Sequence, residues 1–256
     1  MRILLVNDDG YGAEGLMALY EAFKDTHEVM IVAPDTEHSG AGHSVTLRHE
    51  IRAKKRPLGY AVTGTPADCV KLGVRHLMPD CDLVVSGINP GANLGVDCNY
   101  SGTAAAAREA AIQGKQALAV SCYCRRFRDA GYLAEFAVQV AEKLIREPLP
   151  KGVFMNLNLP NVERGRKITV EAAPMGWFVY EEEFKREESG DGSGDIVFSP
   201  VYGKNVIMQE GHVDNALVRS GIATLTTVSW DATHFQTFHT ALKIAKEMKD
   251  AGNLLA

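Results

Sequence analysis

The chain lacks the features that mark membrane, disulfide-stabilised and nucleic-acid-binding proteins. In its 256 residues no apolar run approaches the roughly 20 that a membrane helix needs, and the first, Ile3–Val6, is too short for a signal peptide. Five cysteines, an odd number without paired zinc spacing, are typical of reduced thiols in a cytoplasmic protein. A net charge of −5 gives no electrostatic case for binding a nucleic-acid duplex or a membrane.

The sequence does contain a regular alternation of short apolar segments and helical patterns. Strand–helix alternation favours right-handed crossovers, so it predicts an α/β fold, Rossmann-like, with a mostly parallel sheet and helices on both faces. The predicted strands span residues 3–6, 29–32, 83–85, 118–120, 153–157 and 222–228.

Helices are predicted between these strands from apolar side chains that recur on one face. They cover residues 16–23, 104–112 and 133–144, and a last helix carries Phe235, Phe238, Leu242 and Ala245. The segment TPAD, residues 65–68, predicts a further helix start, with a capping threonine, a proline in the first turn and an acid that answers the cap.

The pattern divides the chain into three parts. Residues 1–160 form the predicted Rossmann-like core, and residues 222–256 supply a returning strand and the C-terminal helix. Between them, residues 161–221 read as a β-rich arm or insertion, with a mobile tip near residues 186–195. Arms of this kind often bind a second subunit, and a solvated hairpin is the alternative.

The glycines that follow the first strand fit two kinds of site. GYGAEG, residues 10–15, has the spacing of a dinucleotide-binding turn, and Asp35 lies 20 residues past Gly15, where a ribose-binding acid belongs. However, Asp8 and Asp9 would place two negative charges beside the pyrophosphate, and at ~4 Å each repulsion costs about 1 kcal/mol even in water. The acids therefore favour a metal site over a nicotinamide site, and a plain turn is the remaining alternative.

Two further loops at strand ends supply polar side chains, at residues 35–44 and 86–103. Their carboxylate, hydroxyl and amide oxygens suit Mg²⁺ or Mn²⁺ better than zinc or copper. His38 and His43 have no ligand spacing, although one of them could donate a proton to a leaving group.

The segment Ser101-Gly102-Thr103 opens the alanine-rich helix and offers hydroxyls and backbone N–H groups as an anion cradle. A simple N-cap is the alternative. A metal beside an anion cradle indicates phosphate chemistry, in which the metal lowers the pKa of an attacking water and Asp8 or Asp9 orients that water. A covalent phospho-aspartate stays open.

Five motifs and a sixth segment occur in an order that resembles the SurE family of stationary-phase survival proteins, which are metal-dependent nucleoside monophosphate phosphatases. They are NDDG, VAPDTEHSG, GTPADCVKLG, VVSGINPGANLG and YSGT, followed by NLNLP, over residues 1–160. The resemblance implies hydrolysis of nucleoside 5′- and 3′-monophosphates and of short polyphosphate, by a homodimer or homotetramer that exchanges contacts through the arm.

The same resemblance implies which residues act. It places metal ligands at Asp8, Asp9, Ser39 and Asn89, and the two aspartates are the expected catalytic residues. It places phosphate contacts at Asn93 and at the turn Ser101, Gly102 and Thr103. Two other functions remain as alternatives, a non-catalytic metal-dependent nucleotide sensor and, less favoured by the charges, an NAD-dependent oxidoreductase.

Overall fold

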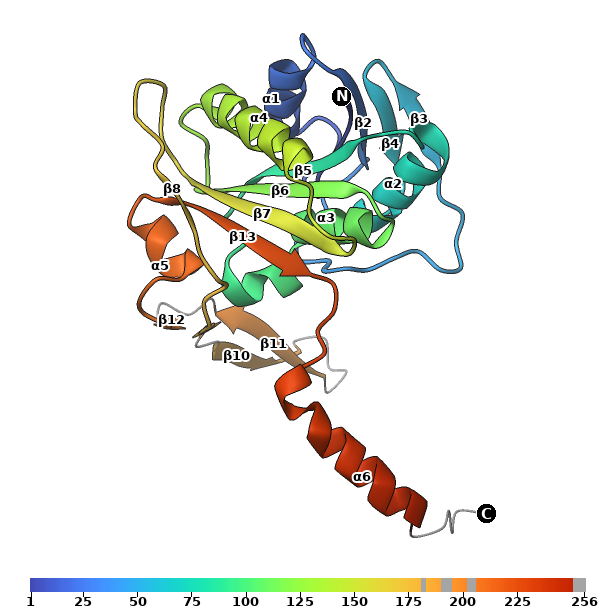
Figure 1. Cartoon of the computed structure of the whole chain (residues 1–256), viewed down its shortest axis with the longest axis vertical. Coiled ribbons are helices and arrows are strands. Elements are labelled where there is room, and N and C mark those ends of the chain that lie inside the picture. The colour runs from blue at the N-terminus through green and yellow to red at the C-terminus, as the bar shows by residue number, and fades with distance from the viewer. Residues whose placement is uncertain (181–182, 190–194, 202–205, 251–256) are drawn as a thin grey trace.

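The computed structural model describes residues 1–180, 183–189, 195–201 and 206–250 and has one large sheet at its centre (Figure 1). In spatial order its nine strands are β3 (Ala53–Arg56), β4 (Gly59–Val62), β2 (Glu28–Pro34), β1 (Arg2–Val6), β5 (Leu83–Pro90), β6 (Gln116–Tyr123), β7 (Val153–Pro160), β13 (Ala223–Ser229) and β8 (Val170–Ala172). In this order all neighbouring strands from β4 to β7 are parallel, β3 and β13 pair antiparallel with β4 and β7, and β8 pairs parallel with β13. The predicted mostly parallel α/β fold is therefore confirmed.

Helices cover both faces of this sheet, which explains why its central strands are continuously apolar. Helices α1 (Glu14–Phe23) and α4 (Ala130–Arg146) pack on one face, and α2 (Pro66–Leu72) and α3 (Gly102–Ile112) pack on the other (Figure 1). The first strand feeds both layers, since Ile3 and Leu5 join the core under α1 and α4 while Leu4 and Val6 join the core under α2 and α3.

Local sequence signals account for the ends of two of these helices. The Thr65 hydroxyl accepts the N–H of Asp68, whose carboxylate accepts the N–H of Thr65, so the predicted capping box begins α2. Ser101 is the N-cap of α3, and the alanines of that helix are buried against the sheet. Short helical turns follow or precede these elements at Gly73–Leu77, Gly95–Asn99 and Phe235–Thr237.

The β3–β4 hairpin was not predicted from the sequence. All four residues of β3, AKKR, are exposed at the edge of the sheet. A strand without a buried face carries no alternation of apolar and polar side chains, and the sequence pattern therefore shows nothing there.

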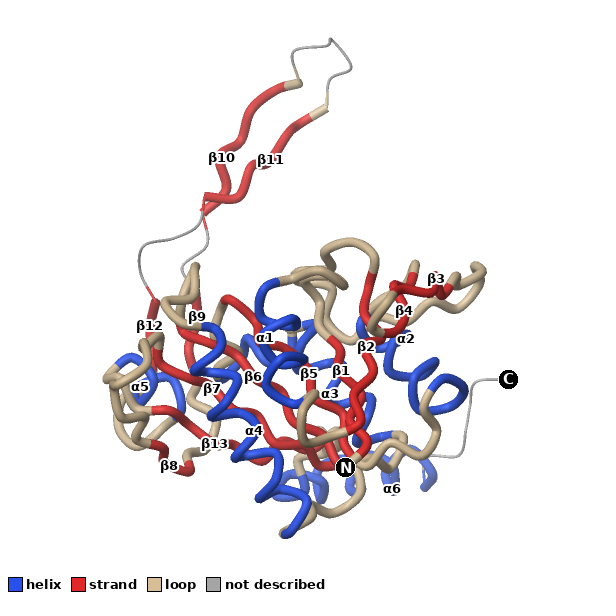
Figure 2. The backbone as a smooth tube through the Cα atoms, turned by 90° about the horizontal axis from the view of Figure 1, so that it is seen from above, coloured by secondary structure: helices blue, strands red, loops and turns tan. Residues whose placement is uncertain are grey.

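The arm is built of two small antiparallel sheets. Strand β9 (Phe178–Tyr180) pairs with β12 (Val206–Met208), and β10 (Glu183–Glu188) pairs with β11 (Ile196–Val201) in a hairpin that projects from the body (Figure 2). Strand β8, which falls within residues 161–221, lies in the main sheet. A short helix, α5 (Asp214–Arg219), follows β12, and residues 190–194 of the predicted mobile tip lie outside the described residues.

The last helix, α6 (Phe238–Asp250), extends away from the body (Figure 1). Its apolar residues are not buried, since Leu242 is 59% exposed, Ile244 56% and Met248 57%. Among the described residues, none of the helices is both long and apolar enough to cross a membrane.

Candidate active site

A pocket of about 320 Å³ lies where β1, β2 and β5 end at the same edge of the sheet. Parallel strands bring their carboxyl ends together, which is where α/β proteins bind ligands. The structure thus gathers residues from the three polar loops that follow these strands. Six of the predicted site residues line the pocket, namely Asp8, Asp9, Ser39, Asn89, Asn93 and Ser101.

The two aspartates after β1 are held in an environment that opposes their charge. Asp8 is 4% exposed, and burial raises its pKa although the Thr103 hydroxyl donates to its Oδ1 atom. Burial, and then the neighbouring charge of Asp8, raises the pKa of Asp9 to about 7. Glu37 adds a third negative charge that acts on both carboxyls. A bound cation would stabilise the charged forms of Asp8, Asp9 and Glu37.

The oxygen atoms present fit a hard divalent cation. The buried Oδ2 atom of Asp9 has no hydrogen-bond partner among the described residues, so a lone-pair donor is left over at the pocket. Among the described residues, no group of three or more His, Cys, Asp or Glu side chains is placed to hold a metal ion by itself, so hydroxyl and amide oxygens would have to complete the ligand set. Two carboxylates completed by hydroxyl and amide oxygens match the preference of Mg²⁺ and Mn²⁺.

Ser39 and Asn89 are oriented so that oxygen lone pairs remain for such a cation. The Ser39 hydroxyl donates its proton to Oε1 of Glu37 at 2.6 Å. The Asn89 amide nitrogen donates to the carbonyl of Gly91 at 2.6 Å, which leaves the amide oxygen as the free end of the side chain. The loop that carries Ser39 is tied to the first strand, because the N–H of His38 donates to the carbonyl of Asp8 at 2.8 Å.

The start of α3 packs directly against Asp8. A Cβ atom on Gly102 would lie 2.7 Å from the Cβ of Asp8 and 2.8 Å from its Oδ2, so only glycine allows this approach. Thr103 is fully buried and does not line the pocket, but its hydroxyl donates to Oδ1 of Asp8. The predicted contacts of Gly102 and Thr103 with phosphate stay predictions, and they would have to use the backbone N–H groups of the first turn.

Asn93 belongs to a buried polar network that the sequence analysis did not find. Its amide nitrogen donates to the Ser121 hydroxyl at 2.8 Å, its backbone N–H donates to Asn158, and its carbonyl accepts from Asn156 and Asn158. The signal was the alternation of asparagine and leucine in NLNLP at the end of an apolar strand. The Cys98 thiol also donates to this carbonyl, and because burial raises its pKa to about 12 it is no nucleophile at neutral pH.

Neither loop histidine lines the pocket. The ring of His43 instead contacts Oε2 of Glu109 at 2.9 Å, and Glu109 also accepts from Gln113 on α3. The hydrogen bond from His43 lowers the pKa of Glu109 even though the burial of that carboxyl raises it. His43 therefore anchors the loop that carries Ser39 to the same helix that begins at the pocket.

The last glycine of the dinucleotide-like pattern has a packing role. A Cβ atom on Gly15 would lie 2.0 Å from the carbonyl oxygen of Ile88, so α1 can approach the end of β5 only with glycine at this position. Ile88 directly precedes Asn89, and the close approach therefore fixes a residue of the pocket. Gly15, which matches the glycine spacing of a dinucleotide-binding turn, is thus explained by packing beside the acidic pocket.

The chain as a whole is similar to known proteins. The family model described as survival protein SurE matches residues 3–182. The chain belongs to the SurE family. It is 37% identical over 246 residues to the 5′-nucleotidase SurE of Syntrophobacter fumaroxidans, covering 94% of this chain and 98% of that protein. Identity with the 5′-nucleotidase SurE of Desulfatibacillum aliphaticivorans is 50% over 172 residues, which are 63% of this chain and 66% of that one.

The fold also matches a solved member of the SurE family. The crystal structure of the SurE protein from Aquifex aeolicus superposes with a TM-score of 0.83 at 33% identity, over 96% of this chain and all of that one. The resemblance stated from the motifs is thereby confirmed. In this chain the acidic pocket described above lies at the edge of that α/β sheet.

Three residues with polar side chains in the pocket wall of this SurE chain were not predicted from the sequence. They are Glu37, Asp97 and Tyr100. Burial raises the pKa of Asp97, whose carboxylate accepts the hydroxyl of Tyr180 at 2.9 Å. Tyr180 lies in β9, so this contact ties the pocket to the arm, and a pattern within one segment cannot reveal such a long-range partner.

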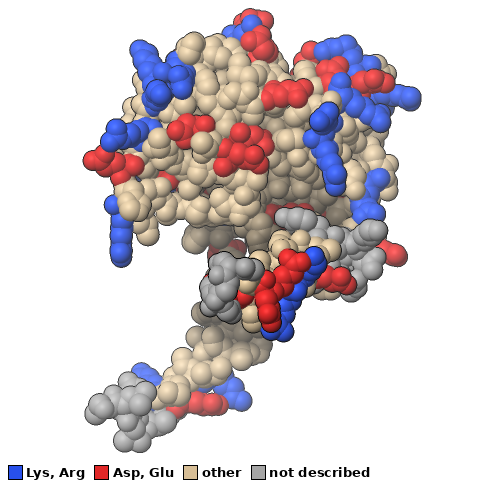
Figure 3. Space-filling model, turned by 180° about the vertical axis from the view of Figure 1, so that it is seen from behind, with Lys and Arg blue, Asp and Glu red and all other residues tan. Residues whose placement is uncertain are grey.

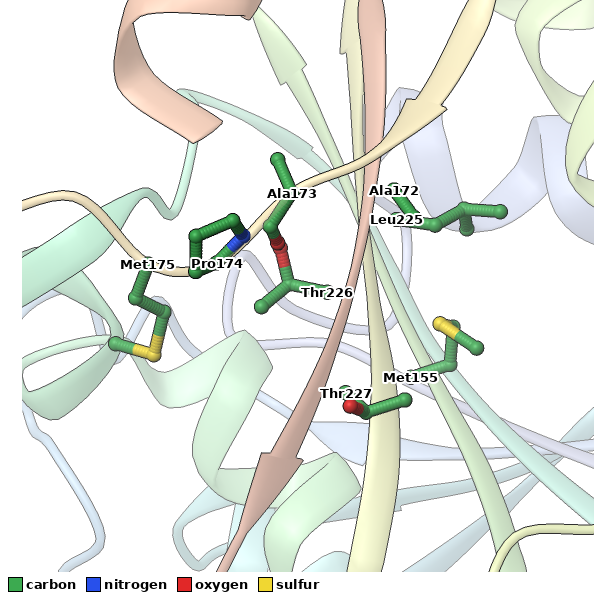
Figure 4. Close-up of a pocket in the computed structure, with 8 residues that line it drawn as sticks. All are labelled: Met155, Ala172, Ala173, Pro174, Met175, Leu225, Thr226 and Thr227. Carbon is green, nitrogen blue, oxygen red and sulfur yellow. The ribbon is translucent and has the colours of Figure 1, made fainter. Parts of the chain in front are cut away.

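A second cavity, of about 640 Å³, lies at the far edge of the sheet where the chain turns away from β13 after β8 (Figure 4). Its wall is formed by side chains such as Met155, Pro174 and Leu225. The hydroxyl of Thr226 donates to the carbonyl of Ala173. No ionisable side chain is among the described residues of this wall. The acidic pocket is therefore the better candidate for catalysis.

The described residues on the face seen in Figure 3 do not form a surface of one charge sign such as a nucleic-acid duplex would need. On the side seen in Figure 3, basic and acidic side chains are interspersed. This distribution matches the small net negative charge of the chain.

Proposed function

We propose that this chain is a metal-dependent 5′-nucleotidase that hydrolyses nucleoside monophosphates to nucleoside and phosphate. The observation that carries the proposal is the pair Asp8 and Asp9, with an unpartnered buried oxygen, at the start of a helix that can receive an anion. The names of relatives that align over nearly the whole chain support the same activity.

In this proposal Asp8, Asp9, Ser39 and Asn89 hold one Mg²⁺ or Mn²⁺. The cation would supply charge stabilisation at a phosphoryl oxygen and would lower the pKa of water at the site. Asp8 is fixed for this task by Thr103 and by the contact with Gly102. Asp9 offers its free Oδ2 atom to the cation or to the attacking water.

Ser101 and Asn93 would hold the phosphate. The Ser101 oxygen already accepts the N–H of Ala104 at 2.9 Å, so its proton is left to donate to a phosphoryl oxygen. The first turn of α3 adds backbone N–H groups that have no partner within the helix. Asn93 is held rigid by Ser121 and Asn158, which fixes its position relative to the substrate.

The proposal extends to further substrates, to the oligomeric state and to the cellular compartment. We infer that 3′-monophosphates and short polyphosphate are also cleaved, that the enzyme acts as a homodimer or homotetramer, and that it works in the cytoplasm. All five cysteines are free in the structure, as a reducing compartment requires. The arm and α6 support an assembly because both expose apolar side chains.

Phosphate release tests the proposal. The purified chain is given a panel of nucleoside 5′- and 3′-monophosphates with Mg²⁺ or Mn²⁺, and again with excess EDTA. We expect release with metal and none with EDTA. Folded protein that binds nucleotides with metal but releases no phosphate would support a sensor, and release that persists in EDTA would contradict the metal site.

A further inference from the structure

Tyr100 brings an aromatic ring to the wall of the acidic pocket. The residue is 65% exposed, so its side chain is not part of the core. It directly precedes Ser101, the N-cap of α3. The wall around it consists largely of carboxylates, a hydroxyl and amides, such as Asp97, Ser39 and Asn93.

The backbone of Tyr100 is held by hydrogen bonds on both sides of the peptide, whereas its side chain is exposed. Its N–H donates to the carbonyl of Asp97 at 3.0 Å, and its own carbonyl accepts the N–H of Gly42, also at 3.0 Å. The carboxylate of Asp97 is in turn held by the hydroxyl of Tyr180. A loop of β2, the turn before α3 and the arm thus fix the point from which this ring projects.

We propose that Tyr100 is the specificity-determining residue of this site and that its ring stacks on the base of the substrate. The inference rests on the proposed nucleotidase function. A nucleoside monophosphate places its base one sugar away from the phosphate, and Tyr100 lies one residue away from Ser101. Every base has a π-face, so stacking favours nucleotides over simple sugar phosphates without selecting one base.

Ribose 5-phosphate separates this role from the chemistry, because it carries the same sugar and phosphate without a base. We would measure KM and kcat for AMP, CMP and ribose 5-phosphate in the wild type, Tyr100→Ala and Tyr100→Phe. Stacking on an aromatic side chain changes binding roughly 5- to 150-fold. Tyr100→Ala should therefore raise KM for both nucleotides about tenfold, with kcat and the ribose 5-phosphate values unchanged. Tyr100→Phe keeps the ring and should behave as wild type.

Different results would contradict the stacking role of Tyr100 and the proposed nucleotidase function. An equal loss on all three substrates in Tyr100→Ala would overturn the inference, because it would indicate displacement of Ser101. So would unchanged nucleotide KM values. A wild type that hydrolyses none of the three would overturn the proposed function and the inference together. Thermal unfolding of both variants shows that the exposed substitution leaves the fold intact.

Discussion

Asp8 and Asp9 lie side by side at the end of β1 but are held in different ways. Asp8 is buried against α3 and accepts from Thr103, whereas the Oδ2 atom of Asp9 has no partner among the described residues. Burial opposes the charge of both groups. The fold therefore maintains two carboxylates that it would hold more easily if they were neutral, which is expected of ligands and not of structural acids.

Substitution of Asp8 by asparagine should abolish phosphatase activity and leave the fold intact. The amide oxygen can still accept from Thr103, while the charge that attracts the cation is lost. A metal ion contributes several kcal/mol of transition-state stabilisation, so we expect kcat/KM to fall at least about a hundredfold. Phosphate release measures the loss, and thermal unfolding in EDTA should show no destabilisation.

Asp35→Asn is the matched control for this variant. Asp35 also follows a strand, β2, but it is exposed and does not line the acidic pocket. It should retain wild-type activity. Near-wild-type hydrolysis by Asp8→Asn would show that the metal lies elsewhere.

Metal binding should depend on pH through Asp9. In the metal-free protein the pKa of Asp9 is raised to about 7, above its value in the unfolded chain. The contribution of this group to stability is therefore present at low pH and is lost as the pH rises from about 4 through 7. A cation binds the ionised form, so the rise in Tm caused by Mn²⁺ should grow between pH 6 and pH 8.

Thermal unfolding with and without Mn²⁺ across this pH range is the measurement. Asp9→Asn should reduce the pH dependence of the metal effect, and the part that remains belongs to Asp8, whose pKa is also raised by burial. If the wild type shows an equal increase in Tm at pH 6 and pH 8, no carboxyl with a raised pKa takes part in binding.

At the scale of elements, the sequence predicted those strands and helices that have an apolar buried face. The central strands and the helices α1 to α4 are apolar on their buried faces, and residue patterns located them together with the acids at the strand ends. The polar support of Asn93 could not be predicted in this way. It depends on the register of β6 and β7, which pairs Ser121 with Asn158 across the sheet.

Gly15→Ala tests the packing between α1 and the loop that carries Asn89. The new methyl group would meet the Ile88 carbonyl at 2.0 Å, and the backbone would have to move. Overpacking of this kind costs about 1–3 kcal/mol of unfolding free energy. We expect that loss in denaturant titrations, together with weaker Mn²⁺ binding because Asn89 shifts with Ile88.

Gly12→Ala is its matched control in the same turn. A Cβ atom on Gly12 would meet nothing within 4 Å, and its backbone does not have a positive φ. Its stability should stay within about 0.5 kcal/mol of the wild type. Equal stability of the two variants would refute the packing role assigned to Gly15.

At the scale of the whole molecule, two elements are left without enough contacts to be stable alone. The β10–β11 hairpin is exposed along both strands, and an isolated hairpin is only marginally stable in water. Helix α6 has 13 residues, which is also marginal without packing, and its apolar face is exposed. Both elements project from the same body (Figures 1 and 2), and in the proposed assembly we expect them to be covered by a second copy of the chain.

Leu242→Asp should weaken the proposed assembly, because it places a charge in the middle of the apolar face of α6. Light scattering coupled to size exclusion should show a dimer or tetramer for the wild type and a shift toward monomer for the variant. Thr240→Asp adds the same charge at an exposed polar position of the same helix and should leave the assembly unchanged.

The active-site pocket contains no residue of α6, so a monomeric Leu242→Asp that is still folded should also retain activity. A wild type that is monomeric at micromolar concentration would leave the exposed apolar face without a self-association role, and loss of activity on dissociation would show that the partner subunit completes the site.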